Sequence, residues 1–350
     1  MGETDHRSGK LLCRACEHAM KHNAIWITWE SQRRNRELSA ALDAVLFEFS
    51  EIDRMSNRVT KYARGAARTI AALRRTRPRL VFCQNPSLVL TLLLVFLRPF
   101  FGFRLCVDAH NAGLFPREGR SSVLMAVSRY VQRRANLTLV SNEALADHVR
   151  ANGGRAFALP DKIPTILPSE RRVLRGAHNI LFICTYSKDE PYKEVFAAAR
   201  LIDAAICIYV TGNFTRSGIR QEDLPPNVIL TGFLSEPEYA AMLRSVDATV
   251  DLTTREDCLV CGAYETLALA KPMILSDTRA LRSYFSRGAV YVLGTAQSIA
   301  DGITEAIRTK TTLEIEAAEL SALRAREWEE KRTALLEILG LIDAGEQAGA

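Results

Sequence analysis

The sequence predicts an α/β fold made of two Rossmann-like, doubly wound domains that face each other across a ligand cleft. Short β-branched runs alternate with longer helical stretches along most of the 350 residues, as in parallel sheets covered by helices. The alternation lapses once, between Pro160 and His178, where prolines are closely spaced. The length is sufficient for two domains of about 100 to 200 residues each, and two such domains imply a ligand cleft between them.

The first half of the chain contains five apolar runs that predict buried strands, with a helical stretch after each of them. The second of these helices should end before Pro78, because proline cannot continue a helix. The expected strands are Ala24–Trp29, Ala44–Phe49, Arg79–Gln84, Phe103–Asp108 and Leu137–Val140. The expected helices begin at Glu30 and Leu88 or span Asn57–Arg77, Val123–Arg134 and Glu143–Ala151.

The same alternation restarts in the second half and ends in helical segments. The last of them carries Glu, Ala, Leu and Arg at helical spacing from Leu313 to Ile342, with Trp328 inside it. The expected strands are Asn179–Cys184, Ala205–Thr211, Val228–Thr231, Ala248–Thr254, Met273–Ser276 and Ala289–Val292. The expected helices are Pro191–Ala204, Glu236–Ser245 and a short helix that opens at Gly262.

These elements define the expected domain boundaries. Residues 1–23 form an N-terminal extension, 24–165 the first domain and 166–178 the linker. Residues 179–310 form the second domain, and 311–350 a C-terminal helical segment that we expect to pack back toward the first domain.

Charge is divided unevenly along the chain. The first 168 residues carry 26 Lys and Arg against 14 Asp and Glu, a net charge of +12, and the remainder carries −6. Arginines at 33, 34, 36 and between 64 and 79 supply most of this excess, and we expect them to form a basic face. Such a face suits an anionic membrane surface or an acidic acceptor. Aromatic residues are not interleaved with it, which disfavours nucleic-acid binding.

Several features favour a cytoplasmic protein. The first 23 residues lack the apolar core of a secretory signal, and four of the eight cysteines fall in apolar runs, as free thiols do. The longest apolar run, Leu88–Leu97, is well short of the ~20 residues that span a bilayer. Metal and dinucleotide cofactors are not expected. Cys13, Cys16, His18 and His22 have too short a spacing for zinc, and neither a Gly-x-Gly-x-x-Gly nor a Walker motif is present.

The stretch from Thr253 to Asp277 is the strongest functional candidate. It predicts strand, loop, helix and strand, and ligands bind at the carboxyl ends of such strands. A carboxylate at Glu265 can accept hydrogen bonds from a ribose diol, and the amides of Gly262 and Ala263 at the helix start can hold a phosphate. The plain alternatives are a helix N-terminal carboxylate for Glu265 and a turn residue for Asp257.

This stretch resembles the donor-site signature of retaining glycosyltransferases of family four, which have the GT-B fold. In that family two glutamates flank the loop with seven residues between them, as Asp257 and Glu265 do here, and a Gly-Lys-Pro turn follows, here Ala270-Lys-Pro272. Leu230–Tyr239, which includes Gly232 and Phe233, resembles the pocket for the nucleotide base. In the first domain the resemblance rests on Gln84-Asn-Pro86 and Asp108-Ala-His-Asn111.

The resemblance implies that the second domain binds a nucleoside diphosphate sugar and the first a saccharide or lipid-linked acceptor. Transfer would proceed with retention and without an enzymic nucleophile, in polysaccharide or glycolipid assembly. Asp257 stands where the family has glutamate, with Glu256 as the alternative contact to the sugar. Lys188 or Lys193 would neutralise the diphosphate. His110, beside Asp108 and Asn111, would contact the donor sugar or the acceptor.

Three alternatives stay open. Gly212 and Asn213 either lie near the donor diphosphate or simply form a turn after a strand. Nucleotide-sugar 2-epimerases have the same fold of two Rossmann-like domains. An epimerase would need acid and base carboxylates from both domains. The replacements at Asp257 and Ala270 also fit a binding or regulatory protein without catalysis.

Overall fold

The computed structural model of the chain describes residues 23–52, 57–85 and 87–341. The chain divides into two compact units, one made of residues 1–161 and 328–350 and the other of residues 162–327. The division after Asp161 lies before the expected linker, so residues 166–178 are part of the second unit. They carry no helix or strand before His178. The expected N-terminal extension, with its four possible zinc ligands, lies outside the described residues apart from Asn23.

The first unit is built on a six-stranded parallel sheet in the order β2-β1-β3-β4-β5-β6. The five predicted strands are confirmed, each to within one residue at either end. The sixth, β6, was not predicted because its Ala-Phe-Ala sequence has no β-branched residue. The strands are β1 (Ala24–Thr28), β2 (Val45–Glu48), β3 (Leu80–Asn85), β4 (Arg104–Ala109), β5 (Leu137–Val140) and β6 (Ala156–Ala158).

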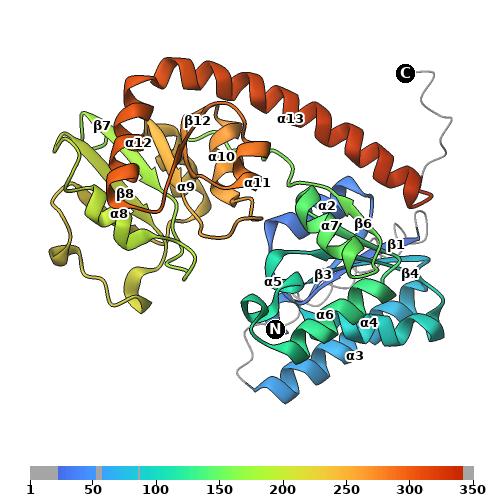
Figure 1. Ribbon diagram of the computed structural model, residues 1–350. Helices are drawn as coiled ribbons and strands as arrows, with labels where there is room; N and C mark the ends of the chain where they lie inside the picture. The colour runs from blue at the N-terminus through green and yellow to red at the C-terminus, as the bar shows by residue number, and fades with distance from the viewer. Residues whose placement is uncertain (1–22, 53–56, 86, 342–350) are drawn as a thin grey trace, which may run out of the picture. The chain divides into compact units, whose positions relative to one another are not determined.

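Helices connect these strands and cover both faces of the sheet (Figure 1). The Asn57 side chain caps the long basic helix α3 by accepting from the amides of Val59 and Thr60, and Arg77 ends it in a left-handed conformation before Pro78. The helices of this unit are α2 (Arg33–Ala41), α3 (Arg58–Thr76), α4 (Leu88–Phe101), α5 (Asn111–Leu114), α6 (Ser122–Arg134) and α7 (Glu143–Ala151). No helix in the described part of the chain is long and apolar enough to cross a membrane.

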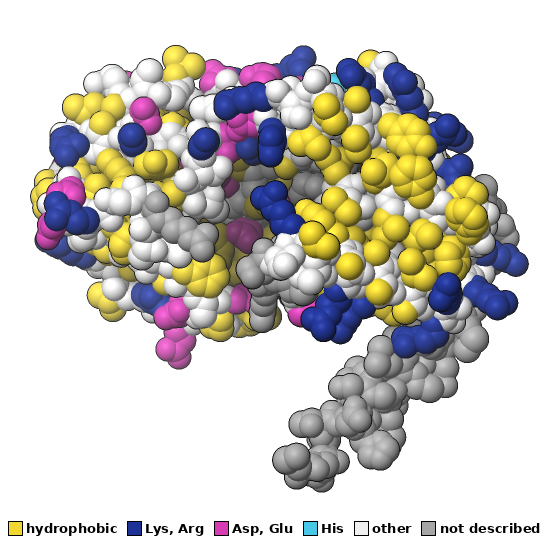
Figure 2. All heavy atoms as spheres, turned by 90° about the horizontal axis from the view of Figure 1, so that it is seen from below, with side chains coloured by type: hydrophobic (Ala, Val, Ile, Leu, Met, Phe, Trp, Pro, Cys, Tyr) yellow, Lys and Arg dark blue, Asp and Glu magenta, His cyan; other side chains and the backbone are white. Residues whose placement is uncertain are grey.

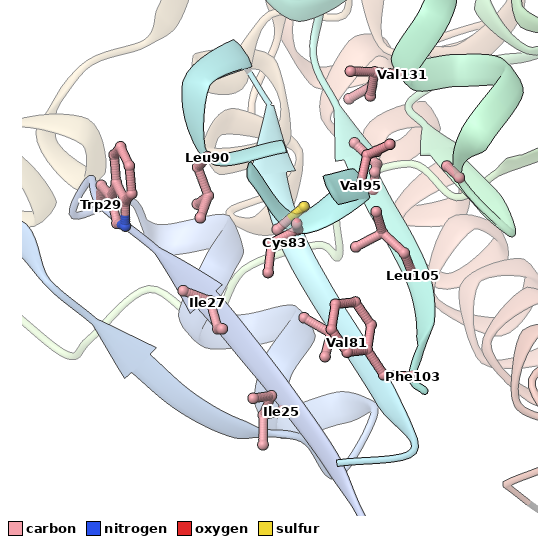
Figure 3. Packing of buried hydrophobic residues seen from close by; sticks show 14 of the residues in the cluster. Ile25, Ile27, Trp29, Val81, Cys83, Leu90, Val95, Phe103, Leu105 and Val131 are labelled. Carbon is pink, nitrogen blue, oxygen red and sulfur yellow. The ribbon is translucent and has the colours of Figure 1, made fainter. Parts of the chain in front are cut away.

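Alternate residues of the central strands fill two different cores, as the pleat of a strand requires. On one face, Ile25, Ile27 and Val81 pack with Leu90 and other side chains of the covering helices, and all four are fully buried (Figure 3). On the other face, Trp26 stacks on Phe82 with ring centroids 5.3 Å apart. Trp328, Leu335, Leu336 and Leu339 pack into this second core. The final part of the C-terminal helix α13 (Lys310–Ile338) thus belongs to the first unit.

The second unit has its own six-stranded parallel sheet, in the order β12-β11-β10-β7-β8-β9. All six strands were predicted. They are β7 (His178–Phe182), β8 (Ile206–Thr211), β9 (Val228–Gly232), β10 (Ala248–Asp251), β11 (Met273–Ser276) and β12 (Ala289–Val292). The helices are α8 (Tyr192–Ala198), α9 (Glu236–Ser245), α10 (Cys261–Ala268), α11 (Arg279–Tyr284) and α12 (Ala296–Arg308). Helix α8 ends six residues before the predicted end at Ala204, which lies in a turn.

The strand order of this sheet reverses at β7. From β7 the chain adds β8 and β9 on one side and then crosses to add β10, β11 and β12 on the other. The carboxyl ends of β7 and β10 therefore lie side by side at a topological switch point, which is where ligands bind in open α/β sheets.

Candidate functional site

Two loops meet at the switch point of the second sheet, one after β7 and one after β10. Asp189 joins them: its carboxylate accepts from the Thr253 hydroxyl at 3.1 Å and pairs with the Arg255 guanidinium at 3.2 Å. Its carbonyl oxygen accepts from the Thr254 amide at 2.7 Å. The loop after β7 is thus held against the loop that carries Glu256 and Asp257.

Glu190 gives the loop after β7 its shape. Its carboxylate accepts from the amides of Thr185 and Ser187, both at 2.9 Å, and from the Thr185 hydroxyl at 2.8 Å. The two candidate lysines differ in position: Lys188 lies in this loop and Lys193 in the first turn of α8. Both are exposed, and neither makes an ion pair among the described residues.

Asp251, at the end of β10, occupies the start of helix α10. The amides of Gly262 and Ala263 donate to its carboxyl group, and a Cβ on Gly262 would lie only 2.6 Å from Asp251 Oδ2. Gly262 and Ala263 are both buried. The prediction that these two amides are exposed to a phosphate is therefore wrong, because Asp251 covers them. Burial, together with the nearby Glu190 and Glu265 carboxylates, raises the pKa of Asp251 well above its ordinary value.

Glu265 lies one turn further along α10 and is half-buried. The Tyr239 hydroxyl of α9 donates to Glu265 Oε2 at 2.5 Å, which fixes the direction of the carboxylate. Burial and this carboxylate raise the pKa of Tyr239, so its hydroxyl stays protonated and remains a donor. Sequence reasoning did not single out Tyr239, since only the packing of α9 beside α10 brings the two together.

Glu256 and Asp257, the two candidates for sugar contact, both face Arg279 at the start of α11. The Arg279 amide donates to Glu256 Oε1 at 2.7 Å, so Glu256 caps this helix. The Arg279 guanidinium donates to Asp257 Oδ1 at 2.9 Å. This arginine is 70% exposed and was missed by sequence reasoning. Asp257 thus lies at the surface of the loop beside a solvent-exposed cation.

The ends of β8 and β9 complete this edge of the second unit. Gly212 follows β8 with a φ of +94°, and a Cβ there would lie 2.1 Å from the Cys184 carbonyl oxygen, so only glycine fits. Asn213 is exposed and its Oδ1 accepts from the amide and hydroxyl of Thr215. These bonds form the simple turn after a strand that was one of the two alternatives for Gly212 and Asn213. Gly232 ends β9, and the Phe233 ring that follows is 84% exposed.

A buried ion pair organises the corresponding edge of the first sheet. The Arg34 guanidinium donates from Nε and Nη2 to the Asp108 carboxylate at 2.8 to 3.1 Å, and its Nη1 pairs with Asp161. Burial acts to raise the pKa of Asp108, but Arg34 and His110 together outweigh it and hold that pKa low. Arg34 is 9% exposed, so the prediction that it belongs to a basic face is wrong. Asp108 is similarly enclosed, with 1% exposure, and its carboxylate serves this pair rather than a ligand.

His110 is a candidate of the first unit that reaches the surface. Its side chain is 35% exposed, and its Nε2 lies 3.5 Å from Asp108 Oδ2 and 3.4 Å from Gln84 Nε2. Gln84 accepts in turn from Asn35 at 2.6 Å. The ring is therefore positioned by a buried polar network. Asn111 follows His110 as the first residue of α5 and is half-buried.

Groups of three or more His, Cys, Asp or Glu side chains that could hold a metal ion do not occur within the described ranges. Cys83, Cys106, Cys184 and Cys207 are free and buried, as the apolar runs around them predicted.

No protein-family model matches the sequence, and no curated protein sequence matches it either. Similar solved structures do exist. HepE from Anabaena, in complex with UDP and glucose, has a TM-score of 0.68 at 12% identity over 95% of this chain and 96% of that one. Sucrose-phosphate synthase from Thermosynechococcus elongatus has a TM-score of 0.64 at 14% identity over 80% and 78%. A putative UDP-N-acetylglucosamine 2-epimerase from Listeria monocytogenes has a TM-score of 0.58 at 10% identity over 91% and 98%.

These similarities confirm the predicted fold class. The α/β architecture with two Rossmann-like domains is shared with structures that match over most of this chain. At such low identity they establish the fold, and fold alone does not decide between transfer and epimerisation.

Proposed function

We propose that this chain is a glycosyltransferase that transfers a sugar from a nucleoside diphosphate sugar to an acceptor, with the donor bound by the second unit. The observation that carries the proposal is the Glu265 carboxylate, aligned by Tyr239 at 2.5 Å beside the switch point of the sheet. HepE, which shares the fold over 95% of this chain, was solved in complex with UDP-glucose.

Each part of the donor has a candidate partner. Glu265 accepts from the ribose hydroxyls, as an acidic residue does in Rossmann folds. The exposed Phe233 ring beside Gly232 offers a face on which the base stacks. Asp257 is the better candidate for the sugar, because Glu256 already caps α11 through the Arg279 amide.

The diphosphate needs positive charge, and the loop after β7 together with the first turn of α8 supplies it. Because Asp251 covers the amides of Gly262 and Ala263, Lys188 and Lys193 are the remaining candidates for this role. A lysine beside the departing diphosphate stabilises the charge that develops as the bond to the sugar breaks.

We further propose retention of configuration, as the family resemblance implies. The anomeric C–O bond to the diphosphate breaks, the acceptor oxygen bonds to the same face of the sugar, and the acceptor proton passes to the leaving phosphate. His110, held by Asp108 and Gln84, contacts the sugar or the acceptor. The acceptor is a saccharide or a lipid-linked saccharide met on the cytoplasmic side of a membrane.

Thermal unfolding with UDP-, GDP-, ADP- and dTDP-sugars tests donor binding. A ligand that binds only the folded state stabilises it by about 2.7 kcal/mol at 100 times its Kd. We expect one nucleotide family to raise the melting temperature. Failure of all four at millimolar concentration contradicts the proposal.

The 2-epimerase is the second candidate because a putative enzyme of that kind shares the fold. It would need carboxylates from both domains as acid and base. Asp108, the candidate carboxylate at the end of a strand in the first unit, is buried and paired with Arg34, which argues against an epimerase. Incubation with the donor alone separates the two functions, because an epimerase converts it without an acceptor. A binding protein without catalysis would bind the donor and transfer nothing to any acceptor extract.

We also propose that the first unit docks on an anionic membrane. Helix α4 packs between α3 and α6, and these helices expose Val59, Phe96, Phe100 and Val123 by 57 to 84%. Figure 2 shows hydrophobic side chains gathered on one face of this unit with Lys and Arg around them. Exposed arginines such as Arg64 lie on α3, next to this apolar face. Apolar insertion and attraction to anionic headgroups reinforce each other at a membrane surface.

Liposome flotation tests the docking. We expect wild type to float with anionic vesicles at low salt, and Phe100→Ser to float less. Leu201→Ser is the matched control, since Leu201 is 54% exposed in the second unit. Binding that is unaffected by lipid charge, by salt and by Phe100→Ser contradicts docking through this face.

A further inference from the structure

A polar pocket lies in the second unit, away from the proposed donor site. It encloses about 280 Å³ and is lined by Ser169, Arg171, Arg244, Lys271 and Glu314, with Leu269 and Ala270. Lys271 precedes β11, and Arg244 lies in the last turn of α9 shortly before β10. The pocket is therefore at the amino edge of the sheet, whereas Glu265 and the loop after β7 are at the carboxyl edge.

Two buried polar atoms of this pocket lack a partner. Ser169 Oγ and Arg244 Nε are inaccessible and make no hydrogen bond with the described residues. The Arg244 guanidinium is nevertheless fixed, since its Nη2 donates to the carbonyl oxygens of Ile166 at 3.1 Å and Leu167 at 3.3 Å. Buried polar groups in folded proteins are nearly always hydrogen-bonded, so these two atoms leave hydrogen-bonding capacity unused in the wall of the pocket.

Lys271 adds a buried ammonium group to the lining. It is 9% exposed, and its ammonium donates to the Val246 carbonyl oxygen at 2.5 Å. That bond uses one of three N–H groups. Burial lowers the pKa of Lys271 to about 8, with Lys310 and Arg171 acting in the same direction and Glu314 and Asp247 opposing them.

The charges around the pocket are unbalanced toward positive. Arg171, Arg244 and Lys271 face it, and Glu314 is the acidic residue of its lining. Asp247 does not offset this excess, because Lys310 pairs with it at 2.6 Å. A group with negative charge and several acceptor oxygens would pair with Arg171, Arg244 and Lys271 together.

We propose that this pocket binds the phosphate group of a small molecule, at a site separate from that of the sugar donor. A phosphate carries up to two negative charges and three strong acceptor oxygens, which match the two guanidinium groups and the ammonium of the lining. The volume admits a phosphate with a small attached group rather than a nucleotide sugar. The proposal goes beyond the glycosyltransferase function and does not depend on it.

Isothermal titration calorimetry of the full chain tests the site, with inorganic phosphate and a hexose 6-phosphate as probes and saturating UDP present throughout. We expect saturable binding that Arg171→Ala and Lys271→Met each weaken at least tenfold. Arg200→Ala, an exposed arginine of the same unit outside the pocket, is the matched control and should bind as wild type does. Tighter binding of the hexose 6-phosphate identifies a phosphorylated metabolite as the ligand, and equal binding identifies free phosphate.

Two further measurements make the result specific. At pH 8, where Lys271 is partly deprotonated, binding should take up protons, so the observed enthalpy should vary with the ionisation enthalpy of the buffer. Lys271→Met should abolish this variation. The double variant Lys188→Ala/Lys193→Ala should bind phosphate unchanged, which separates this site from the donor site even if UDP does not bind. Absence of binding for both probes, or wild-type affinity in Arg171→Ala, overturns the proposal, and Arg171 is exposed enough for that variant to fold.

Discussion

Glu265→Gln is the substitution that tests the donor site most directly. It keeps the length and shape of the side chain and removes its charge. The Tyr239 hydroxyl, 2.5 Å from Oε2 in wild type, can still donate to the amide oxygen, so the packing of α9 against α10 should be preserved. A change in nucleotide affinity is then a property of the site rather than of folding.

The expected magnitude follows from the chemistry of the contact. A hydrogen bond to a charged group contributes about 1.5 to 3 kcal/mol. An amide oxygen retains one acceptor, while the NH₂ group replaces the other acceptor with a donor. We therefore expect the loss of about one charge-assisted bond, which at 1.4 kcal/mol per factor of ten is a roughly 10- to 150-fold weaker affinity.

Calorimetry with UDP and 2′-deoxy-UDP isolates the ribose contact. Wild type should prefer UDP, and Glu265→Gln should bind the two nucleotides almost equally. The difference between these two preferences is the coupling energy between Glu265 and the ribose 2′-hydroxyl in a thermodynamic cycle. Glu305→Gln on α12 of the same unit is the control and should retain the preference. If Glu265→Gln retains both the affinity and the preference, Glu265 does not bind the ribose. If wild type binds another nucleotide family instead, its ribose and 2′-deoxyribose forms replace UDP in the cycle.

Three predictions concern stability. Arg34→Met leaves Asp108 buried without its partner and should lower the free energy of unfolding by about 3 to 5 kcal/mol. Calorimetry should show a transition roughly 6 to 20 °C below that of wild type. Arg33→Met, at an exposed position, is the control, and equal transition temperatures for the two variants would contradict the role of the ion pair. The pKa of Asp251 is raised on folding, so the folded chain holds a proton that the unfolded chain releases, and its contribution should fall as the pH rises from about 4 through that raised pKa. Urea unfolding across this range should show a shallower fall in Asp251→Asn, and identical pH profiles would refute the assignment. Ala270 has a φ of +51°, which costs an L-residue about 1 to 2 kcal/mol. Ala270→Gly should therefore raise the free energy of unfolding by about 0.5 to 1 kcal/mol, after the entropic cost of the more flexible glycine is subtracted. A urea midpoint below that of wild type would show that the strain is relieved elsewhere.

Local sequence identified most elements of the fold because buried parallel strands are continuous apolar runs. Met273–Ser276 and Leu137–Val140 were predicted to the residue for that reason. The short strand Ala156–Ala158 lacks this signal, since it pairs with β5 through backbone hydrogen bonds that any sequence can make. The unit boundary after Asp161 directly follows Pro160, the first of the closely spaced prolines, and lies before the predicted linker because the residues from Lys162 onward belong to the second unit. The prolines thus mark irregular chain rather than the limit of a core.

By itself, the sequence determined the α/β class, the strand at each candidate loop and the position of Glu265 and His110 at strand or helix ends, because these depend on periodicity along the chain. Which polar groups are open to a ligand was decided only by tertiary structure. Asp251 and the amides of Gly262 and Ala263 lie 11 and 12 residues apart in sequence and satisfy each other. Arg34 and Asp108 lie 74 residues apart and form a buried pair. Ser169, Arg244 and Lys271 line one pocket from three segments that are far apart in sequence. Burial and pairing arise from contacts between distant segments, and a linear pattern does not encode which carboxylate or guanidinium finds its partner inside the protein.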